Sequence, residues 1–445
     1  MAFRTALRAW FAISLQTFGG PAGQIAVMQR ELVDQRRWIG QRRFQHALNY
    51  CMLLPGPEAQ QLAIYIGWLL NGLRGGLAAG ILFVLPGMIA LLALSAIYVG
   101  FGDTTAVAAL FAGLGPAVVA IVVQAVVRVA GRALTHPLLV GLGVAAFAAL
   151  ALFAVPFPIV IAVAALVGWL AGRRRPALGR AAGHISSEGP APLISDDMLH
   201  TETPSPRRTW KILGVCLGLW ATPVLLTVLL TGAGSVFTAQ GLFFSGTALV
   251  TFGGAYAVLA FVAQQAVQVY GWLGASDMVR GLALAETTPG PLIMVVQFVA
   301  FLGAFHHPGP FNPWVAGVLG SLLTTWVTFV PCFLFIFLGA PYIERLRSNT
   351  ALSSALTGIT AAVVGVIANL ALYFTVTTLF TRTALLATGP LSIHLPDLTT
   401  LRPVQLGIAV TAALLIFAAH WSILRVLGVC AVLGIAAGLL GLPIT

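Results

Sequence analysis

The sequence contains little charge and almost no lysine. Asp, Glu, Lys and Arg make up only 8% of its 445 residues, about a third of their share in a soluble domain, and Lys211 is the single lysine. Apolar residues make up 59%, and the mean hydropathy is +0.97. This balance excludes a soluble globular domain and indicates a chain that lies in a lipid bilayer.

Cysteine is also scarce. The four cysteines are scattered through apolar stretches, without a C-x-x-C pair or a paired histidine, so neither a disulfide framework nor a metal site is supported, and we expect no cofactor. The motifs H-E-x-x-H, G-x-S-x-G and G-x-x-x-x-G-K-[ST] are missing as well. Their absence disfavours an intramembrane enzyme and a nucleotide-driven pump.

The net charge of +11 does not indicate a nucleic-acid partner, because the arginines gather at the ends of apolar segments, where they act as topology signals. No alternating pattern of a barrel is present. Four apolar runs are long enough to cross a bilayer, against the ~20 residues that a helix needs: residues 77–100, 105–127, 212–230 and 315–338. We therefore predict an all-α polytopic membrane protein.

The chain contains an internal repeat. The Thr-Phe-Gly-Gly of residues 17–20 recurs at residues 251–254, an offset of 234 (251 − 17), and the Pro-Gly-Pro of residues 55–57 recurs at 289–291 with the same offset. Such duplication is common in secondary transporters. Further along, where the second half carries an insertion, Gly113 corresponds to Gly358 at offset 245, and Gly168 corresponds to Gly434 at offset 266.

The repeat divides the chain into four parts. Residues 1–172 form a first transporter repeat, and residues 173–211, rich in arginine, proline and serine, form a cytoplasmic linker. Residues 212–234 supply a connecting transmembrane helix with no counterpart in the first half, and residues 235–445 form the second repeat. One extra crossing between the repeats predicts that the second repeat is inverted.

Charge placement agrees with inversion. The loop between the two motifs of the first half carries five arginines, whereas the equivalent stretch of the second half has only Asp277 and Arg280 as charges. The positive-inside rule places the first loop in the cytoplasm and the second outside. The fold prediction is therefore two inverted-topology repeats.

Short apolar segments around the glycine and proline motifs have cytoplasmic arginines on both flanks, so they are expected to enter and leave on one side. We predict two broken or re-entrant helical hairpins in each half, followed by four crossings. With the connecting helix this gives nine full spans and four hairpins, and more spans if the proline-broken segments cross.

Broken helices expose amide N–H groups at the positive end of a helix dipole, where an anion is favoured. Four such breaks, two from each half, are expected to converge near the midplane, with neutral amide and hydroxyl donors beside them. The alternative is that the breaks are packing kinks, with the polar groups serving the broken backbone. The predicted substrate-binding residues are Gly19, Gly20, Pro21, Gln24, Pro55, Gly56, Pro57, Gln60, Gln61, Thr251, Gly253, Gly254, Gln264, Gln265, Thr287, Thr288, Pro289, Gly290 and Pro291.

Two carboxylates lie beside the breaks. Glu58 directly follows Pro57, and Glu286 precedes Pro289 by three residues. Carboxylates in apolar segments are costly when ionised, so both are predicted to couple transport to protons. Glu58 has a second interpretation as a helix N-terminal cap.

These residues resemble the chromate ion transporter family. The likeness rests on residues 18–25 and 54–61 in the first half and on 251–256, 264–265 and 286–291 in the second, and it covers nearly the whole chain. The match fits the long-chain, two-domain form. The resemblance implies chromate efflux across the bacterial inner membrane, with resistance to chromate, sulfate as a related or competing anion and the proton gradient as the driving force.

Three other functions stay open at this point. A permease for sulfate or another tetrahedral oxyanion is the nearest, because chromate and sulfate are dianions of similar size. A channel and an intramembrane enzyme are the others, although the sequence lacks a catalytic arrangement for an enzyme. Small-residue faces are compatible with a homodimer.

Overall fold

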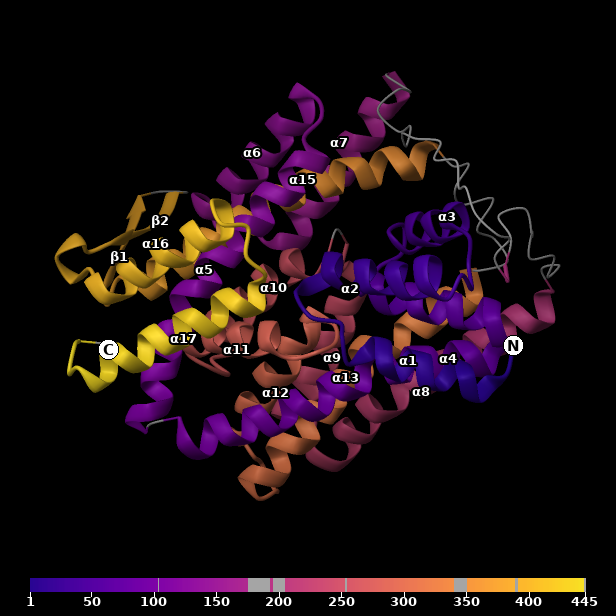
Figure 1. Cartoon of the computed structure of the whole chain (residues 1–445), viewed down its shortest axis with the longest axis horizontal. Helices are drawn as coiled ribbons and strands as arrows, with labels where there is room; N and C mark the ends of the chain where they lie inside the picture. The colour runs from indigo at the N-terminus through magenta and orange to yellow at the C-terminus, as the bar shows by residue number, and fades with distance from the viewer. Residues whose placement is uncertain are drawn as a thin grey trace. The chain divides into compact units, whose positions relative to one another are not determined.

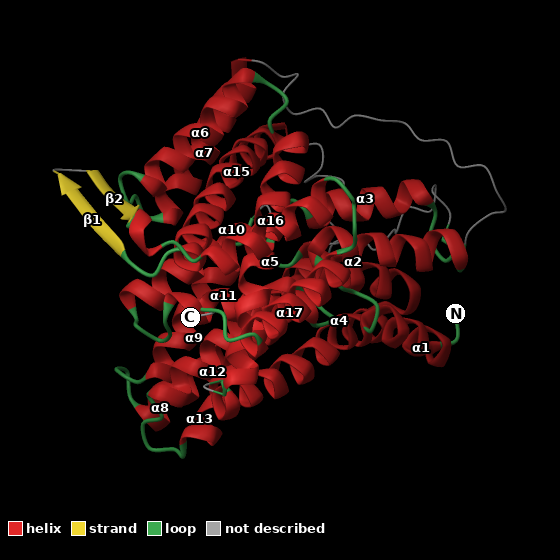
Figure 2. Cartoon of the chain, turned by 60° about the vertical axis from the view of Figure 1, so that its left-hand side comes forward, coloured by secondary structure: helices red, strands yellow, loops and turns green. Residues whose placement is uncertain are grey.

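The computed structural model describes residues 1–102, 104–174, 193–194, 205–252, 254–339, 350–388 and 391–443. Helices dominate these residues (Figure 2), so the helical, polytopic membrane protein expected from composition is confirmed. Among the described residues, six helices are long and apolar enough to cross a bilayer: α4 (Glu58–Phe101), α5 (Thr105–Ala133), α7 (Phe157–Arg174), α8 (Pro206–Thr231), α13 (Pro313–Gly339) and α15 (Thr350–Leu379). The four predicted apolar runs all lie within these helices.

Shorter helices complete the chain (Figure 1). The first half adds α1 (Phe3–Ser14), α2 (Gly20–Gln29), the π-helix η1 (Arg30–Gln35), α3 (Gln41–Cys51) and α6 (Pro137–Ala151). The second half adds α9 (Val236–Val250), α10 (Ala255–Gln264), the π-helix η3 (Gln265–Val269), α11 (Ala275–Thr287), the 3-10 turn η4 (Leu292–Met294), α12 (Val295–His306), the 3-10 turn η6 (Leu398–Thr400), α16 (Pro403–Phe417) and α17 (Ile423–Leu439).

One hairpin departs from the all-helical prediction. Strands β1 (Thr383–Thr388) and β2 (Leu391–Pro396) pair antiparallel, with Thr383 opposite Pro396. Each strand has only six residues, too few for a stable helix of its own. The hairpin therefore forms a small addition between α15 and α16.

The repeat is visible in local structure. In each half a ten-residue helix, α2 or α10, runs into a π-helical turn. The chain then reverses through a residue with positive φ, Arg37 (52°) or Gly271 (61°). The next tryptophan donates its backbone N–H back into the turn, from Trp38 to the Leu32 carbonyl at 2.7 Å and from Trp272 to the Ala266 carbonyl at 2.8 Å. The direction in which each repeat crosses a membrane stays a prediction.

Helix α4 joins two segments across a kink at Asn71 and Gly72, where Gly72 has φ of 60°. The corresponding place in the second half holds the insertion, so that α12 ends at His306 and α13 starts at Pro313. One kinked helix in the first half thus corresponds to two separate helices in the second.

The chain forms two compact units, and each takes segments from both predicted repeats. The first unit comprises Met1–Ala93, Gly179–Ala255 and Thr288–Ser353, and the second comprises Leu94–Leu178, Tyr256–Thr287 and Ser354–Thr445. In the first unit α13 packs against α8, α9 and α12, and in the second α5 packs against α11, α16 and α17. The four-part division of the sequence stays a prediction, and most of its linker lies outside the described residues.

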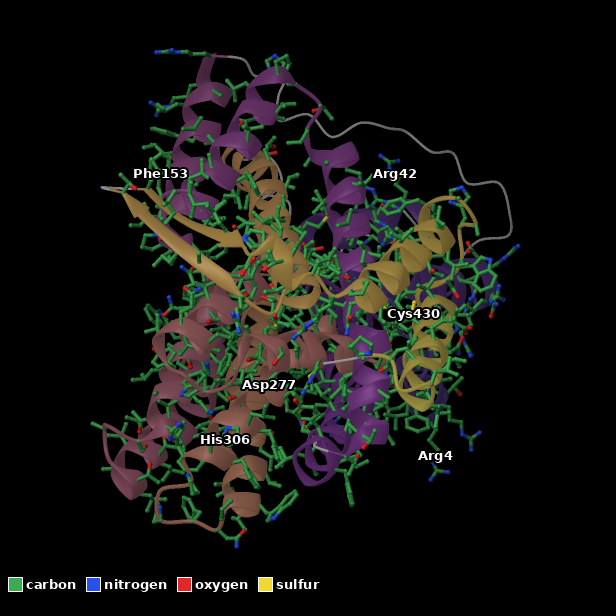
Figure 3. All side chains as sticks on the ribbon, turned by 90° about the vertical axis from the view of Figure 1, so that its left-hand side faces the viewer. Arg4, Arg42, Phe153, Asp277, His306 and Cys430 are labelled. Carbon is green, nitrogen blue, oxygen red and sulfur yellow. The ribbon has the colours of Figure 1, made fainter. Side chains whose placement is uncertain are left out.

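Glycines allow close helix contacts in the second unit. On α5 and α17, a Cβ added to Gly434 would lie 2.7 Å from the Gly113 Cα, and one added to Gly113 would meet the carbonyl of Cys430, which Figure 3 labels on α17. On α7 and α15, a Cβ added to Gly358 would lie 2.8 Å from the Gly168 Cα. Since Gly113 corresponds to Gly358 and Gly168 to Gly434, the two repeats make the same contact twice with their roles exchanged.

Gly358→Val should destabilise the second unit, because the new side chain would meet the Ala164 carbonyl and the Gly168 backbone. We expect a loss of about 1–3 kcal/mol, measured as a lower thermal unfolding midpoint in detergent. Gly407→Val on α16 is the control, since no atom lies within 4 Å of its added Cβ. Equal midpoints for the two variants would contradict the close contact.

Candidate functional site

Two reciprocal backbone hydrogen bonds join the broken helices of the two repeats. The Gly56 N–H donates to the Thr251 carbonyl at 2.8 Å, and the Gly290 N–H donates to the Thr17 carbonyl at 2.9 Å. Thr17 corresponds to Thr251, and Gly56 to Gly290. The Pro-Gly-Pro break of each repeat is therefore bonded to the Thr-Phe-Gly-Gly break of the other, and all four breaks meet within the first unit.

Glycine is required at these breaks by the backbone itself. The φ angles are 73° at Gly20, 116° at Gly56, 102° at Gly254 and 102° at Gly290, in the region that side-chain-bearing residues rarely adopt. After each break a helix starts: α2 at Gly20, with Gly19 as its N-cap, α4 at Glu58, α10 at Ala255 and η4 at Leu292. Four helix N-termini are thereby brought together.

A pocket lies among these N-termini. All of its lining residues belong to the first unit, and residues within or directly after each break contribute to it. None of the described residues in its wall is arginine or lysine, so a bound anion would be held mainly by helix N-termini. The lining residues are Pro21, Gln24, Gly56, Pro57, Glu58, Ala59, Thr251, Gly254, Ala255, Pro291, Leu292 and Ile293.

Three predicted glutamines differ in what they contact. Gln24 is buried and donates to the Gly290 carbonyl at 2.6 Å, and Gln61 donates to the Pro55 carbonyl at 2.6 Å. These two amides satisfy carbonyls of the broken backbone, which is one of the two roles expected from the sequence. Gln60 is fully buried, and neither atom of its amide has a partner among the described residues.

Glu58 lines the pocket as the first residue of α4 and is half-buried. Its carboxylate forms no hydrogen bond or ion pair with any residue that the structure describes. The side chain therefore does not act as a hydrogen-bonding cap for this helix, although it stands at the favourable end of the helix dipole. It is an acidic group next to a site that suits anions.

Glu286 lies in the second unit, near the end of α11, with 1% of its surface exposed. Its Oε1 accepts a hydrogen bond from the Tyr256 hydroxyl at 2.5 Å, while Oε2 has no partner in the described part of the chain. Tyr256 was not among the predicted site residues. A tyrosine just after the repeated Gly-Gly, where the first half has Ala22, was the available signal.

The remaining predicted residues fall in several places. Gln264 and Gln265 are half-buried at the junction of α10 and η3 in the second unit, and Thr287 donates to the Leu284 carbonyl of its own helix at 2.8 Å. Thr288 and Pro289 belong to the first unit, where the Pro289 carbonyl lies close to Gly87. Gly253 lies outside the described residues.

Comparison with known proteins connects this arrangement to a family. The sequence model of the family described as "Chromate transporter" matches residues 4–169 and 238–437. The "Chromate transport protein" of Pseudomonas aeruginosa is 32% identical over 358 residues, which cover 79% of this chain and 76% of that protein. A protein of the same name in Cupriavidus metallidurans is 29% identical over 352 residues, covering 79% and 77%. No solved structure matches the chain significantly.

Gln24→Leu should destabilise the first unit, because it leaves the Gly290 carbonyl without the amide that bonds it. The expected loss is about 1–3 kcal/mol, measured by thermal unfolding in detergent. The control is Gln35→Leu at an exposed position, where a change within about 0.5 kcal/mol is expected. A Gln24→Leu variant as stable as this control would mean that the bond does not hold the breaks together.

Proposed function

Because the chain belongs to the chromate transporter family, we propose that it is a secondary transporter that exports chromate across the inner membrane of a bacterium and thereby confers chromate resistance. The pocket at the four joined breaks supports this proposal most directly, since the helices that follow the breaks start at its lining. Chromate, a tetrahedral dianion, would accept hydrogen bonds from such groups. Donors without full charge hold an anion while still letting it leave.

The membrane potential favours this direction of transport. Moving one elementary charge across 100 mV corresponds to about 2.3 kcal/mol, so an inside-negative potential drives a dianion outward. For a dianion that crosses without a proton, the free energy available from the potential is about twice that of a monovalent anion.

Glu58 would link anion binding to protons. An ionised carboxylate on the pocket wall repels a dianion, whereas the protonated form does not. The protonation state of Glu58 therefore sets how the affinity of the pocket for the anion depends on pH. Glu286, bonded to Tyr256 in the second unit, is the second proposed proton-carrying group.

The test of the function uses purified protein in liposomes, with radiolabelled chromate and an imposed pH gradient. Saturable chromate movement that depends on the gradient is expected, with sulfate as a competitor. Simultaneous recording of the internal pH gives the direction of proton movement for each anion. Sulfate movement without chromate movement would replace the substrate, and unsaturable flux would indicate a channel.

Glu58→Gln should lose the part of the pH dependence of anion binding that comes from this side chain, because the amide cannot ionise. Wild-type affinity is expected to fall by about tenfold as Glu58 loses its proton at rising pH, and the variant is expected to keep the low-pH affinity. Affinity is measured by equilibrium binding of radiolabelled chromate in detergent. Asp34→Asn, at an exposed carboxylate of the same repeat, should retain the wild-type pH dependence. The same dependence in Glu58→Gln would remove Glu58 from its proposed role.

A further inference from the structure

Helix α13 carries a stripe of polar residues on one face. Ser321, Thr324, Thr325, Thr328 and Cys332 follow one another at intervals of three, one, three and four residues, the spacing that keeps side chains on one side of a helix. All five side chains are buried within the first unit. From Ser321 to Cys332 the stripe extends about 17 Å along the helix axis.

Amide side chains from neighbouring helices meet one end of this stripe. Ser321 donates to the Gln297 carbonyl at 3.2 Å, and Thr325 contacts the Gln297 Oε1 at 3.4 Å. Gln240 of α9 donates to the Ala300 carbonyl at 3.0 Å, and its Oε1 lies 2.8 Å from the place of an added Cβ on Gly320. Polar side chains of α9, α12 and α13 therefore lie near one another here.

The other end of the stripe reaches the pocket. Gln61 donates to the Pro55 carbonyl at 2.6 Å, and both its amide and the Cys332 thiol lie beside Gly56. The Cys332 Sγ lies 3.1 Å, and the Gln61 Nε2 2.9 Å, from the place of an added Cβ on Gly56. Since Gly56 and Glu58 both line the pocket, the contacts lead from α13 to the turn that carries Glu58.

Several polar atoms along this line are buried without a protein partner. Among the described residues these are the hydroxyls of Thr324 and Thr328 and the Oε1 atoms of Gln61 and Gln240. Each of these residues is at most 3% exposed. Buried polar atoms without protein partners are usually satisfied by ordered water, and at membrane depth unsatisfied groups are costly. If these positions served only for packing against apolar neighbours, valine or leucine would fill them as well.

We propose that the polar face of α13 is a hydrated proton path between Gln240 and the Glu58 pocket. Hydroxyl groups and water both donate and accept hydrogen bonds, so a proton can pass along them. The path carries no positive charge that would hold an anion, so protons and chromate would reach the pocket separately. The inference rests on the proposed proton coupling and gives the proton its route.

The double variant Thr324→Val and Thr328→Val tests the path. It removes two hydroxyls at nearly constant volume, so proton movement accompanying chromate in liposomes should fall by about tenfold or more. Chromate binding and chromate–chromate exchange without a pH gradient should not change. Thermal stability should be equal or higher, because neither hydroxyl has a protein partner to lose.

Two further variants serve as controls. Thr375→Val on α15 removes a half-buried hydroxyl that donates to its own helix and should leave proton movement unchanged. The double variant Thr324→Ser and Thr328→Ser keeps both hydroxyls, so it should keep the coupling of proton movement to chromate. It tests the path even where the valine variant does not fold.

The outcomes separate the path from the proposed function. If proton movement is coupled to chromate equally in the wild-type protein and in the valine variant, the path is overturned. The path is also overturned if the serine variant loses this coupling. Chromate transport stays in place in both cases. Wild-type chromate transport without any proton movement would overturn both the coupling and the path. Absence of chromate transport in folded wild-type protein would overturn the proposed function itself.

Discussion

The need of every backbone polar group for a partner at membrane depth is the constraint on which the rest of this structure depends. Glycine and proline break the helices and free N–H and carbonyl groups that lipid cannot satisfy. The reciprocal bonds from Gly56 to Thr251 and from Gly290 to Thr17 meet that need by joining the repeats. The same arrangement leaves the N-termini of the following helices open toward one pocket, so one solution serves both stability and anion binding.

Paired contacts between the two repeats also hold the second unit together. The contacts of Gly113 with Gly434 and of Gly168 with Gly358 use corresponding positions in exchanged roles, as the broken helices of the first unit do. Each unit therefore contains parts of both repeats. A larger side chain at one of these glycines should therefore weaken a contact between the repeats, because small residues there allow the helix backbones to approach.

The two repeats share the backbone of their breaks and of their π-helical turns but differ in their polar side chains. The first contributes Gln24, Glu58, Gln60 and Gln61, at positions where the second has apolar residues. The second instead contributes the pair Tyr256 and Glu286 and the polar face of α13, which extends from Ser321 to Cys332. Duplication thus supplied a common frame of breaks, and later divergence placed the titratable groups unequally within it.

The sequence by itself determined the membrane environment, the helical class, the repeat, the positions of the breaks and the family. These properties follow from local composition, hydropathy and the conformational limits of glycine and proline, which need no knowledge of packing. Only the tertiary structure decided which break bonds to which, that Tyr256 is the partner of Glu286, and that α13 turns a polar face inward toward Gln61. Those contacts join residues far apart in the chain, so they depend on how helices pack and not on any pattern along them.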